Sequence, residues 1–357
     1  MIKITEFLKI QQIGYYYYVT KMKVKDILEN YTIDYYDSVS NENGYQRPIQ
    51  LTHVNKLVGY LVMEDKPILN TGIVGAVYFK DIKIEGKDLV LSSKIRVVDG
   101  QHRLEALKRI KENYSERYTS RFAEFELVLI IIPSEEDKLL EVETFININN
   151  KNKRVSTALA EQLMERIRKS ERPDIYADSF ILEELDKKDK GEIISAICNG
   201  IVNKLSNDKN GIWYQTIKLG DTNNEGKTIS INLFITSLRP VVNNYIQKVY
   251  KKRFNVNSSI NDISKLLDEC WKIVYKKWPD AFNINYYNIQ KGIGVCSLHG
   301  ILCTCIDETS EKTQQNFDSI INRSKITSND WIVGGKFSPY NSRAGFKEIE
   351  NLIKADR

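Results

Sequence analysis

The side chains of this sequence best suited to chemistry lie in the stretch RVVDGQHRLEALKRI, residues 96–110. An apolar run ends at Asp99, Gly100 removes the side chain where the backbone must turn, and leucines at helical spacing follow. The first turn of a helix has free N–H groups and lies at the positive end of the helix dipole. This strand, turn and helix therefore predict a binding site for an anion, best suited to a phosphate group.

The side chains of the turn could act on a bound phosphate. Arg103 offers a bidentate fork, His102 a second donor or a proton carrier, and Asp99 could cap the helix or hold a phosphate-bound Mg²⁺. Hydrolysis would also need a group that orients water, and Gln101 and Glu105 are the candidates within reach. The structural alternative is that Asp99 only caps the helix and Arg103 pairs with a surface carboxylate.

Composition limits the class of protein. The 357 residues, of which 42% are apolar and 28% charged, suffice for a full hydrophobic core and two domains. No apolar run approaches the ~20 residues needed to cross a bilayer, and the N-terminus lacks the cleavage-site pattern of a secretory signal. Five cysteines, an odd number, fit a reducing compartment. We therefore expect a cytoplasmic protein without a membrane partner, and its net charge of +5 permits nucleic-acid binding without arguing for it.

Strand-like and helix-like segments alternate in the N-terminal third of the chain. Aromatic and β-branched runs predict strands, and apolar residues at helical spacing predict helices between them. The alternation indicates an α/β or α+β domain. The predicted strands are 15–22, 75–82, 94–98 and 125–132; one predicted helix begins at Val24, and another follows a cap at Thr52.

The chain changes character after this domain. A helix from Glu135 is expected to lead into an Asn-rich basic loop and then into a helix capped at Ser156 or Thr157. The segment beyond Leu163 is charged and contains a proline, which indicates a boundary. We expect an N-terminal domain over 1–165 and a C-terminal domain over 166–357. The second domain should be mainly helical, around 192–205, 263–277 and 295–306, with one β-hairpin at the turn GDTNNEGK.

The order of several segments resembles that of ParB-like domains, whose fold is shared with sulfiredoxin. The segments are YQRPIQLTHVNKLVGYL, ILNTGIVGAVYF, RVVDGQHRLEALKRI and VLIIIPSEEDKLLEVETFININNKNKRVSTALAEQL. The string DGQHR at residues 99–103 is also similar to the signature of the DGQHR-domain family. Its DndB-like members are linked to DNA phosphorothioate modification and its regulation. The resemblance covers residues 12–165 and extends more weakly to the hairpin region and the C-terminal tail.

The resemblance implies a nucleotide site built around one bound phosphate group. In ParB-like folds a Gly-x-x-Arg turn grips a nucleoside triphosphate, and Gly100 and Arg103 match that pattern. Asn149 and Asn150 resemble the later Asn-rich segment of those domains. The implied cofactor is Mg²⁺ with ATP or CTP. Gln101 stands where sulfiredoxin has its catalytic cysteine, which excludes sulfinic-acid repair, and no helix-turn-helix is evident in residues 166–357.

Basic and amide side chains elsewhere could reach the same anion or DNA. Gln46 and Arg47 precede Pro48 in an extended segment and could extend across the sheet edge toward the phosphate; the alternative is an ordinary loop arginine. A basic cluster before a predicted helix could contact phosphates of a nucleotide or of DNA, or be a solvated loop. That cluster consists of Lys151, Lys153 and Arg154.

The C-terminal half holds two further candidate sites. In GGKFSPYNSRAG, glycines and hydroxyls with Lys336 and Arg343 could cradle phosphates, although a surface loop needs no ligand. Cys296, His299 and Cys303 would share one helix face, which is a geometry that zinc ligands can adopt. Their segment is apolar on every face, which favours a buried core helix in which cysteines pack as small hydrophobes.

The sequence thus predicts a nucleotide-binding, DNA-associated protein of a DNA-modification or defence system. The protein would bind ATP or CTP, could hydrolyse it slowly, and would use the bound state to control its contact with DNA. Both other proteins of the system and a second copy of the chain are candidate partners. One alternative is a transcriptional regulator that binds DNA without a nucleotide. Another is a kinase or nuclease on the same fold, for which Asp99 and Glu105 are the local acidic pair.

Overall fold

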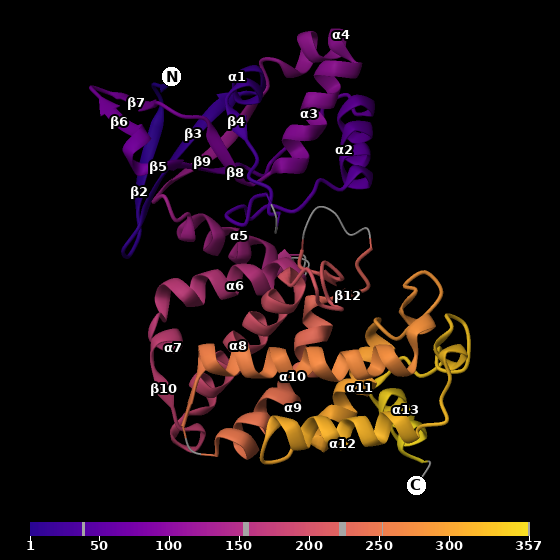
Figure 1. The fold of residues 1–357 in the computed structure, drawn as a ribbon. Coiled ribbons are helices and arrows are strands. Elements are labelled where there is room, and N and C mark those ends of the chain that lie inside the picture. Colours follow the sequence, from indigo (N-terminus) through magenta and orange to yellow (C-terminus); the bar gives the residue numbers. More distant parts are fainter. Residues whose placement is uncertain (38–39, 153–156, 221–225, 252, 356–357) are drawn as a thin grey trace. The chain divides into compact units, whose positions relative to one another are not determined.

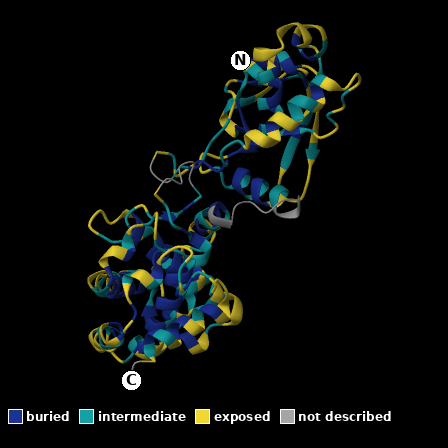
Figure 2. Ribbon diagram, turned by 90° about the vertical axis from the view of Figure 1, so that its right-hand side faces the viewer, coloured by how far each residue is buried: buried dark blue, intermediate teal, exposed yellow. Residues whose placement is uncertain are grey.

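The chain folds into two compact units, each with its own buried interior (Figure 2). The computed structural model describes residues 1–37, 40–152, 157–220, 226–251 and 253–355. The first unit comprises Met1–Leu159, and the second contains most of the chain from Ala160 onward. Within the residues described, no helix combines the length and the apolar composition that crossing a bilayer requires.

The first unit is built on a six-stranded mixed sheet in the order β2-β3-β9-β5-β8-β4. β3 pairs antiparallel with β9, β9 pairs parallel with β5, β5 pairs antiparallel with β8, and β8 pairs parallel with β4. The predicted strands of this region are confirmed, and their β-branched residues fill the buried faces. The strands are β2 Phe7–Gln11, β3 Tyr16–Lys23, β4 Tyr31–Thr32, β5 Ile73–Tyr78, β8 Ile95–Asp99 and β9 Glu126–Ser134.

A smaller three-stranded sheet and several helices complete the first unit (Figure 1). The sheet contains β1 Ile2–Ile4, β7 Asp88–Leu91 and β6 Ile82–Glu85. Helices α2 and α3 pack side by side, and α3 buries Leu104, Leu107 and Ile110 in the core, as the spacing of these residues predicts. The helices are α1 Val24–Glu29, α2 Leu51–Met63, α3 Gln101–Asn113, α4 Ser115–Arg117 and α5 Leu139–Asn152, with short turns η1 Phe79–Asp81 and η2 Tyr118–Phe122.

The Asn-rich segment is helical where a loop was predicted. Helix α5 continues through Asn149 to Asn152, and the amide of Asn149 donates to the carbonyl of Phe145 at 2.8 Å. This bond to the carbonyl one turn earlier lets an asparagine stay in a helix. The loop prediction was wrong because it relied on the preference of asparagine for turns, whereas the apolar residues Val142, Phe145 and Ile146 bury one face of α5.

The second unit is mainly helical, which confirms the α+β class with a helical C-terminal part. Its interior contains Trp213 and Trp271, with ring centroids 4.7 Å apart, and Phe234 packs against Trp213. Its longer helices are α6 Thr157–Glu171, α8 Lys187–Asn207, α9 Ile231–Tyr245, α10 Val256–Lys277, α11 Gly292–Cys305, α12 Ser310–Arg323 and α13 Arg343–Lys354. Its shorter elements are α7 Asp174–Ala177, β10 Ser179–Phe180, η3 Leu182–Glu184, η4 Ile246–Tyr250, β13 Phe254–Asn255, η5 Pro279–Phe282 and η6 Ser328–Trp331.

The predicted β-hairpin around GDTNNEGK is wrong. Strands β11 Ile217–Lys218 and β12 Ile229–Ser230 pair in parallel, whereas a hairpin requires antiparallel strands. Only two residues of the second alternating run, TISINLF, form a strand, because helix α9 begins directly after them. Ser230 caps this helix, and its hydroxyl accepts from the N–H of Leu233. The alternation in the sequence therefore continues into the first turn of a helix.

Candidate functional site

The turn between β8 and α3 has the backbone geometry that the sequence predicts. Gly100 is left-handed, with φ 108° and ψ 7°, and occupies the N-cap position of α3. Its carbonyl accepts from the N–H groups of Arg103 at 2.9 Å and Leu104 at 3.1 Å. A left-handed residue followed by right-handed residues turns successive N–H groups toward one side and forms a concavity suited to anions. The left-handed Gly100 at the start of α3 is compatible with the predicted anion site, which stays a prediction.

Gly100 is required both by its φ and by its surroundings. A Cβ at this position would lie 2.5 Å from Cδ1 of Ile73 and 3.2 Å from Nη2 of Arg103. We expect Gly100→Ala to lower the free energy of unfolding by about 1–3 kcal/mol. Urea unfolding followed by far-UV circular dichroism measures this loss.

Gly86→Ala is the matched control for Gly100→Ala. Gly86 also has a positive φ, 64°, but a Cβ there would meet nothing within 4 Å. This control therefore carries the backbone strain without the steric contact. Equal losses in the two variants would contradict a packing role for Gly100 at the turn.

Arg103 is fully engaged within the turn. Its Nη2 donates to Oδ2 of Asp99 at 2.6 Å, and its Nη1 donates to the carbonyl of Thr71 at 2.7 Å and to the Thr71 hydroxyl. The side chain of Arg103 is 14% exposed. Asp99 therefore pairs with Arg103 and does not cap α3, since the N-cap is Gly100. The guanidinium holds the loop at Thr71 against the turn, and its role as a phosphate clamp stays a prediction.

Gln46 fastens the Gln/Arg-Pro segment to the sheet. Its Nε2 donates to the carbonyls of Val97 at 2.9 Å and Val98 at 2.6 Å, and its side chain is buried. These carbonyls lie on strand β8 just beyond its pairing with the two-residue edge strand β4. Gln46 thus continues the hydrogen bonding of the short strand and positions the following residues beside the turn.

Two further bonds place the same segment against the first turn of α3. Gln101 donates from Nε2 to the carbonyl of Arg47 at 3.3 Å, and the backbone N–H of Gln50 donates to Nε2 of His102 at 3.1 Å. His102 therefore accepts at Nε2, so that nitrogen is not a donor to a phosphate in this arrangement. The structure brings the predicted residues Gln46 and Arg47 together with the turn.

Two side-chain groups, one on Gln101 in the turn and one on Arg47 attached to the turn through its backbone, have no protein partner among the residues that the structure describes. Gln101 is only 5% exposed, and its Oε1 is buried without a hydrogen bond. The guanidinium of the half-buried Arg47 makes no hydrogen bond or ion pair within the same described part of the chain. An unsatisfied buried acceptor and an unpaired cation both cost free energy unless a ligand or water meets them.

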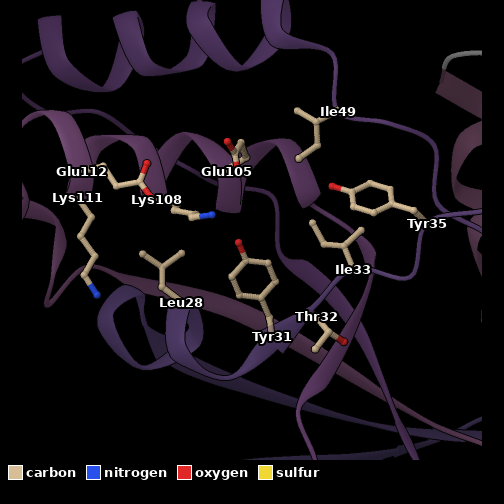
Figure 3. A pocket seen from close by; sticks show the side chains of 10 residues that line it. All are labelled: Leu28, Tyr31, Thr32, Ile33, Tyr35, Ile49, Glu105, Lys108, Lys111 and Glu112. Atoms are coloured by element: carbon tan, nitrogen blue, oxygen red, sulfur yellow. The ribbon is translucent and has the colours of Figure 1, made fainter. Parts of the chain in front are cut away.

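Glu105 faces away from Arg103. Residues two positions apart are separated by about 200° around a helix, so these two side chains leave α3 on opposite sides. Glu105 accepts at Oε1 from Nε of Arg109 at 2.9 Å and lines a pocket shown in Figure 3. Asp99 and Glu105 therefore do not form the acidic pair that a kinase or nuclease would need. Among the described residues, no group of three or more His, Cys, Asp or Glu side chains is arranged to hold a metal ion.

The basic cluster after α5 lies largely outside the described residues. Lys153 and Arg154 belong to a segment that the structure does not describe, and the side chains of Asn150 and Lys151 are likewise outside it. Asn149 is described, and its amide is used within α5. Contacts of this cluster with phosphates stay a prediction.

The C-terminal loop GGKFSPYNSRAG is held by its own hydrogen bonds. Lys336 pairs with Asp330 at 3.2 Å, and the hydroxyl of Ser338 accepts from the N–H of Gly334 at 2.7 Å. Asn288 also donates to Ser338, at 3.2 Å. The charge of Lys336 is thereby balanced by Asp330 of η6, whereas Arg343 begins α13 on the surface. This loop belongs to the second unit, and phosphate binding by it stays a prediction.

Helix α11 is a core helix, as its all-round apolarity predicts. His299 is 1% exposed, with Nδ1 2.8 Å from the hydroxyl of Ser237 and Nε2 accepting from Nε1 of Trp271 at 3.2 Å. Both ring nitrogens therefore have protein partners. Cys303 contacts the amide of Asn244 through its sulfur at 3.2 Å. Of the three residues that could have shared a metal, His299 and Cys303 are thus engaged by protein groups of the second unit.

A buried charged network was not foreseen from the sequence. Glu141, which is fully buried, accepts from Nη2 of Arg96 at 2.6 Å, from the hydroxyl of Ser134 at 2.5 Å and from the hydroxyl of Tyr45 at 2.7 Å. Arg96 also stacks over the ring of Tyr78, 3.7 Å from its centroid. Burial and the charge of Glu141 raise the pKa of Tyr45 well above its usual value. The signal in the sequence was an arginine inside an otherwise apolar strand.

Comparison with protein families gives one finding for the first unit. Residues 6–171 match the model of the family DndB, described as DNA-sulfur modification-associated. No curated protein and no solved structure gives a significant match to the chain. The matched range contains β2 to α6 and therefore the whole β8–α3 turn with its supporting segments.

Proposed function

Because residues 6–171 match the model of the DndB family, described as DNA-sulfur modification-associated, we propose that the first unit binds a nucleoside triphosphate at the β8–α3 turn. The bound state would control contact with DNA within the modification system. The family match supports the association with DNA modification. Nucleotide binding, the choice between ATP and CTP, and DNA contact are the proposed part.

The observation that carries the proposal is that Arg47, whose guanidinium has no partner among the described residues, is attached through its backbone to the first turn of α3. Its backbone carbonyl is bonded to Gln101 in the first turn of α3, next to the left-handed Gly100. A triphosphate would place charge at the N–H groups of this turn and at Arg47. A ribose hydroxyl or a Mg²⁺-bound water could donate to the unsatisfied Oε1 of Gln101. Asp99, the carboxylate of the turn itself, would be the ligand for Mg²⁺, and reaching the metal would loosen its pair with Arg103.

Arg47 and Arg103 have different parts in this proposal. Arg47 would contact the phosphates directly, since its guanidinium is not used by the protein in the described structure. Arg103 would act mainly as a positioning residue, because it ties Asp99 and Thr71 to the turn. Loss of Arg47 should therefore weaken nucleotide binding and leave the turn folded. Loss of Arg103 should weaken nucleotide binding and also destabilise the turn.

Calorimetry with ATP, CTP and GTP in the presence of Mg²⁺ tests the proposal on the full chain. We expect at least one triphosphate to bind, and Arg47→Ala to weaken it by about 10–100-fold, since a hydrogen bond to a charged group contributes about 1.5–3 kcal/mol. Lys87→Ala is the matched control, because Lys87 is an exposed cation in the β6–β7 turn. Phosphate release in the same samples reports any slow hydrolysis.

The outcomes separate the proposal from a nucleotide-independent regulator. If no triphosphate binds, or if Arg47→Ala and Lys87→Ala bind alike, the turn is not a nucleotide site. DNA binding by the nucleotide-free protein that weakens in Arg47→Ala, with a shallower salt dependence, would then assign Arg47 to a DNA phosphate.

A further inference from the structure

A pocket of about 700 Å³ opens on the side of α3 away from Arg103 (Figure 3). Pockets of this size accept small organic ligands. This one lies entirely in the first unit, between the outer face of α3 and the segment that includes β4 and Ile49. Its principal lining residues are Tyr31, Ile33, Tyr35, Ile49, Glu105 and Lys108.

The walls of the pocket suit a flat ring. Two tyrosine rings and the aliphatic side chains of Ile33 and Ile49 provide surface for stacking and apolar contact. Neither tyrosine hydroxyl has a hydrogen-bond partner among the described residues. Burial, with the nearby charge of Glu105, raises the pKa of Tyr31 to about 12 and raises that of Tyr35. Both phenols therefore carry their protons at neutral pH and can donate as well as accept.

Polar groups converge on the middle of the pocket. In Figure 3 the hydroxyl of Tyr31 and the ammonium of Lys108 point into the space below Glu105, and the hydroxyl of Tyr35 points into it from the other side. Lys108 is exposed and makes no ion pair with any described residue. Glu105 is bound by Arg109 through Oε1, which leaves Oε2 as an acceptor.

The charge of the lining argues against a polyphosphate in this pocket. The ionised side chains are two lysines and two glutamates, whose charges cancel; they are Glu105, Lys108, Lys111 and Glu112. A neutral ring that both donates and accepts hydrogen bonds fits such a lining. A carboxylate accepts from exocyclic amines of bases, and a lysine donates to ring nitrogens or carbonyls.

We infer that this pocket binds a nucleobase carrying an exocyclic amine, with Glu105 accepting from the amine and Lys108 donating to the ring. The inference deepens the proposed function and rests on it, since the base would belong to the nucleotide whose phosphates bind at the turn. Gln101 and Glu105 are one helical turn apart on the same face of α3, about 6 Å along its axis. Gln50 and Ile49 connect the two places, because Gln50 is bonded to His102 and Ile49 lines the pocket.

Binding measured with ATP, CTP, GTP, UTP and inorganic tripolyphosphate, each with Mg²⁺, tests the inference on the full chain. UTP has no exocyclic amine, and tripolyphosphate has no base. We expect at least one amine-bearing triphosphate to bind about 10-fold or more tightly than UTP, and tripolyphosphate to bind most weakly. Glu105→Gln should reduce the preference over UTP, and Lys108→Ala should weaken all four nucleotides, while tripolyphosphate is unaffected by both.

Matched controls and a phosphate-free arm keep the two proposals apart. Glu116→Gln and Lys56→Ala change exposed residues outside the pocket and should leave every affinity unchanged. Equal affinities for tripolyphosphate and all nucleotides would overturn the pocket inference and leave the phosphate site standing. If no phosphate compound binds, adenosine, cytidine and short single-stranded oligonucleotides are tested. Binding of these compounds that is lost in Glu105→Gln would support a base site in the pocket, with DNA as the source of the base. If none of these compounds binds, the pocket inference is overturned.

Discussion

Replacement of Glu141 by alanine is expected to lower the free energy of unfolding of the first unit by about 3–5 kcal/mol, the usual cost of breaking a buried ion pair. Arg96 would keep its charge in a site where only 10% of its side chain is exposed. The hydroxyls of Tyr45 and Ser134 would lose their shared acceptor at the same time. Helix α5 would lose its polar attachment to strand β8.

The aromatic residues of the chain allow the two units to be followed separately. All four tryptophans belong to the second unit, namely Trp213, Trp271, Trp278 and Trp331. Urea unfolding followed by far-UV circular dichroism should therefore show the earlier transition of the Glu141→Ala variant. Tryptophan fluorescence should report a transition close to that of the native protein.

The double variant Arg96→Met/Glu141→Leu distinguishes an ion pair from a simple packing defect. Replacing both charges with apolar residues of similar volume removes the uncompensated charge, and such replacements are often neutral or stabilising. We expect the double variant to recover most of the stability lost in Glu141→Ala. If the double variant is as unstable as the single one, the network does not act through charge pairing.

Local patterns in the sequence predicted the elements that form the site. The strand ending at Asp99, the turn at Gly100 and the helix with Leu104, Leu107 and Ile110 on its buried face are all present. Each depends on neighbouring residues along the chain, so hydrophobic spacing and glycine position suffice to predict it. The same local reasoning failed for the Asn-rich end of α5 and for β12, where packing and a helix cap decided the conformation.

The partners of the polar side chains could not be predicted from local patterns. Gln46 bonds to residues 51 and 52 positions away, and Arg96 pairs with a carboxylate 45 positions away. Such pairings depend on the order of strands in the sheet, which a single sequence does not specify. The consequence for the site is direct: the structure engages Arg103 with Asp99 and Thr71, whereas the guanidinium of Arg47, which was also predicted to reach the phosphate, has no partner among the described residues.

The burial of His299 predicts a pronounced dependence of the second unit's stability on pH. Burial lowers the pKa of His299 from 6.5 to about 3 in the folded chain. The hydroxyl of Ser237 donates to the carbonyl of Phe234 at 2.7 Å, so it accepts a proton from Nδ1, and Nε2 accepts from Trp271. The ring is therefore neutral with both nitrogens satisfied, and a second proton would have no acceptor.

The direction of the effect follows from the proton counts of the two states. Between pH 6.5 and about 3 the unfolded chain binds a proton at His299 that the folded chain does not. The contribution of His299 to the free energy of unfolding is fully present above pH 6.5. It falls by about 1.4 kcal/mol per pH unit as the pH is lowered. The full loss on reaching the folded pKa would be about 4–5 kcal/mol, as an order of magnitude.

His299→Gln tests this assignment because glutamine can still accept from Trp271 and donate to Ser237 without titrating. We expect the variant to show a smaller slope of unfolding free energy against pH between pH 4 and 6, by about one proton. Urea unfolding followed by tryptophan fluorescence measures the slope, since Trp271 contacts the ring directly. His53→Gln, a change at an exposed histidine of α2, should leave the slope at its native value. Equal slopes in the native protein and His299→Gln would mean that His299 gains a proton acceptor when the second unit is acidified.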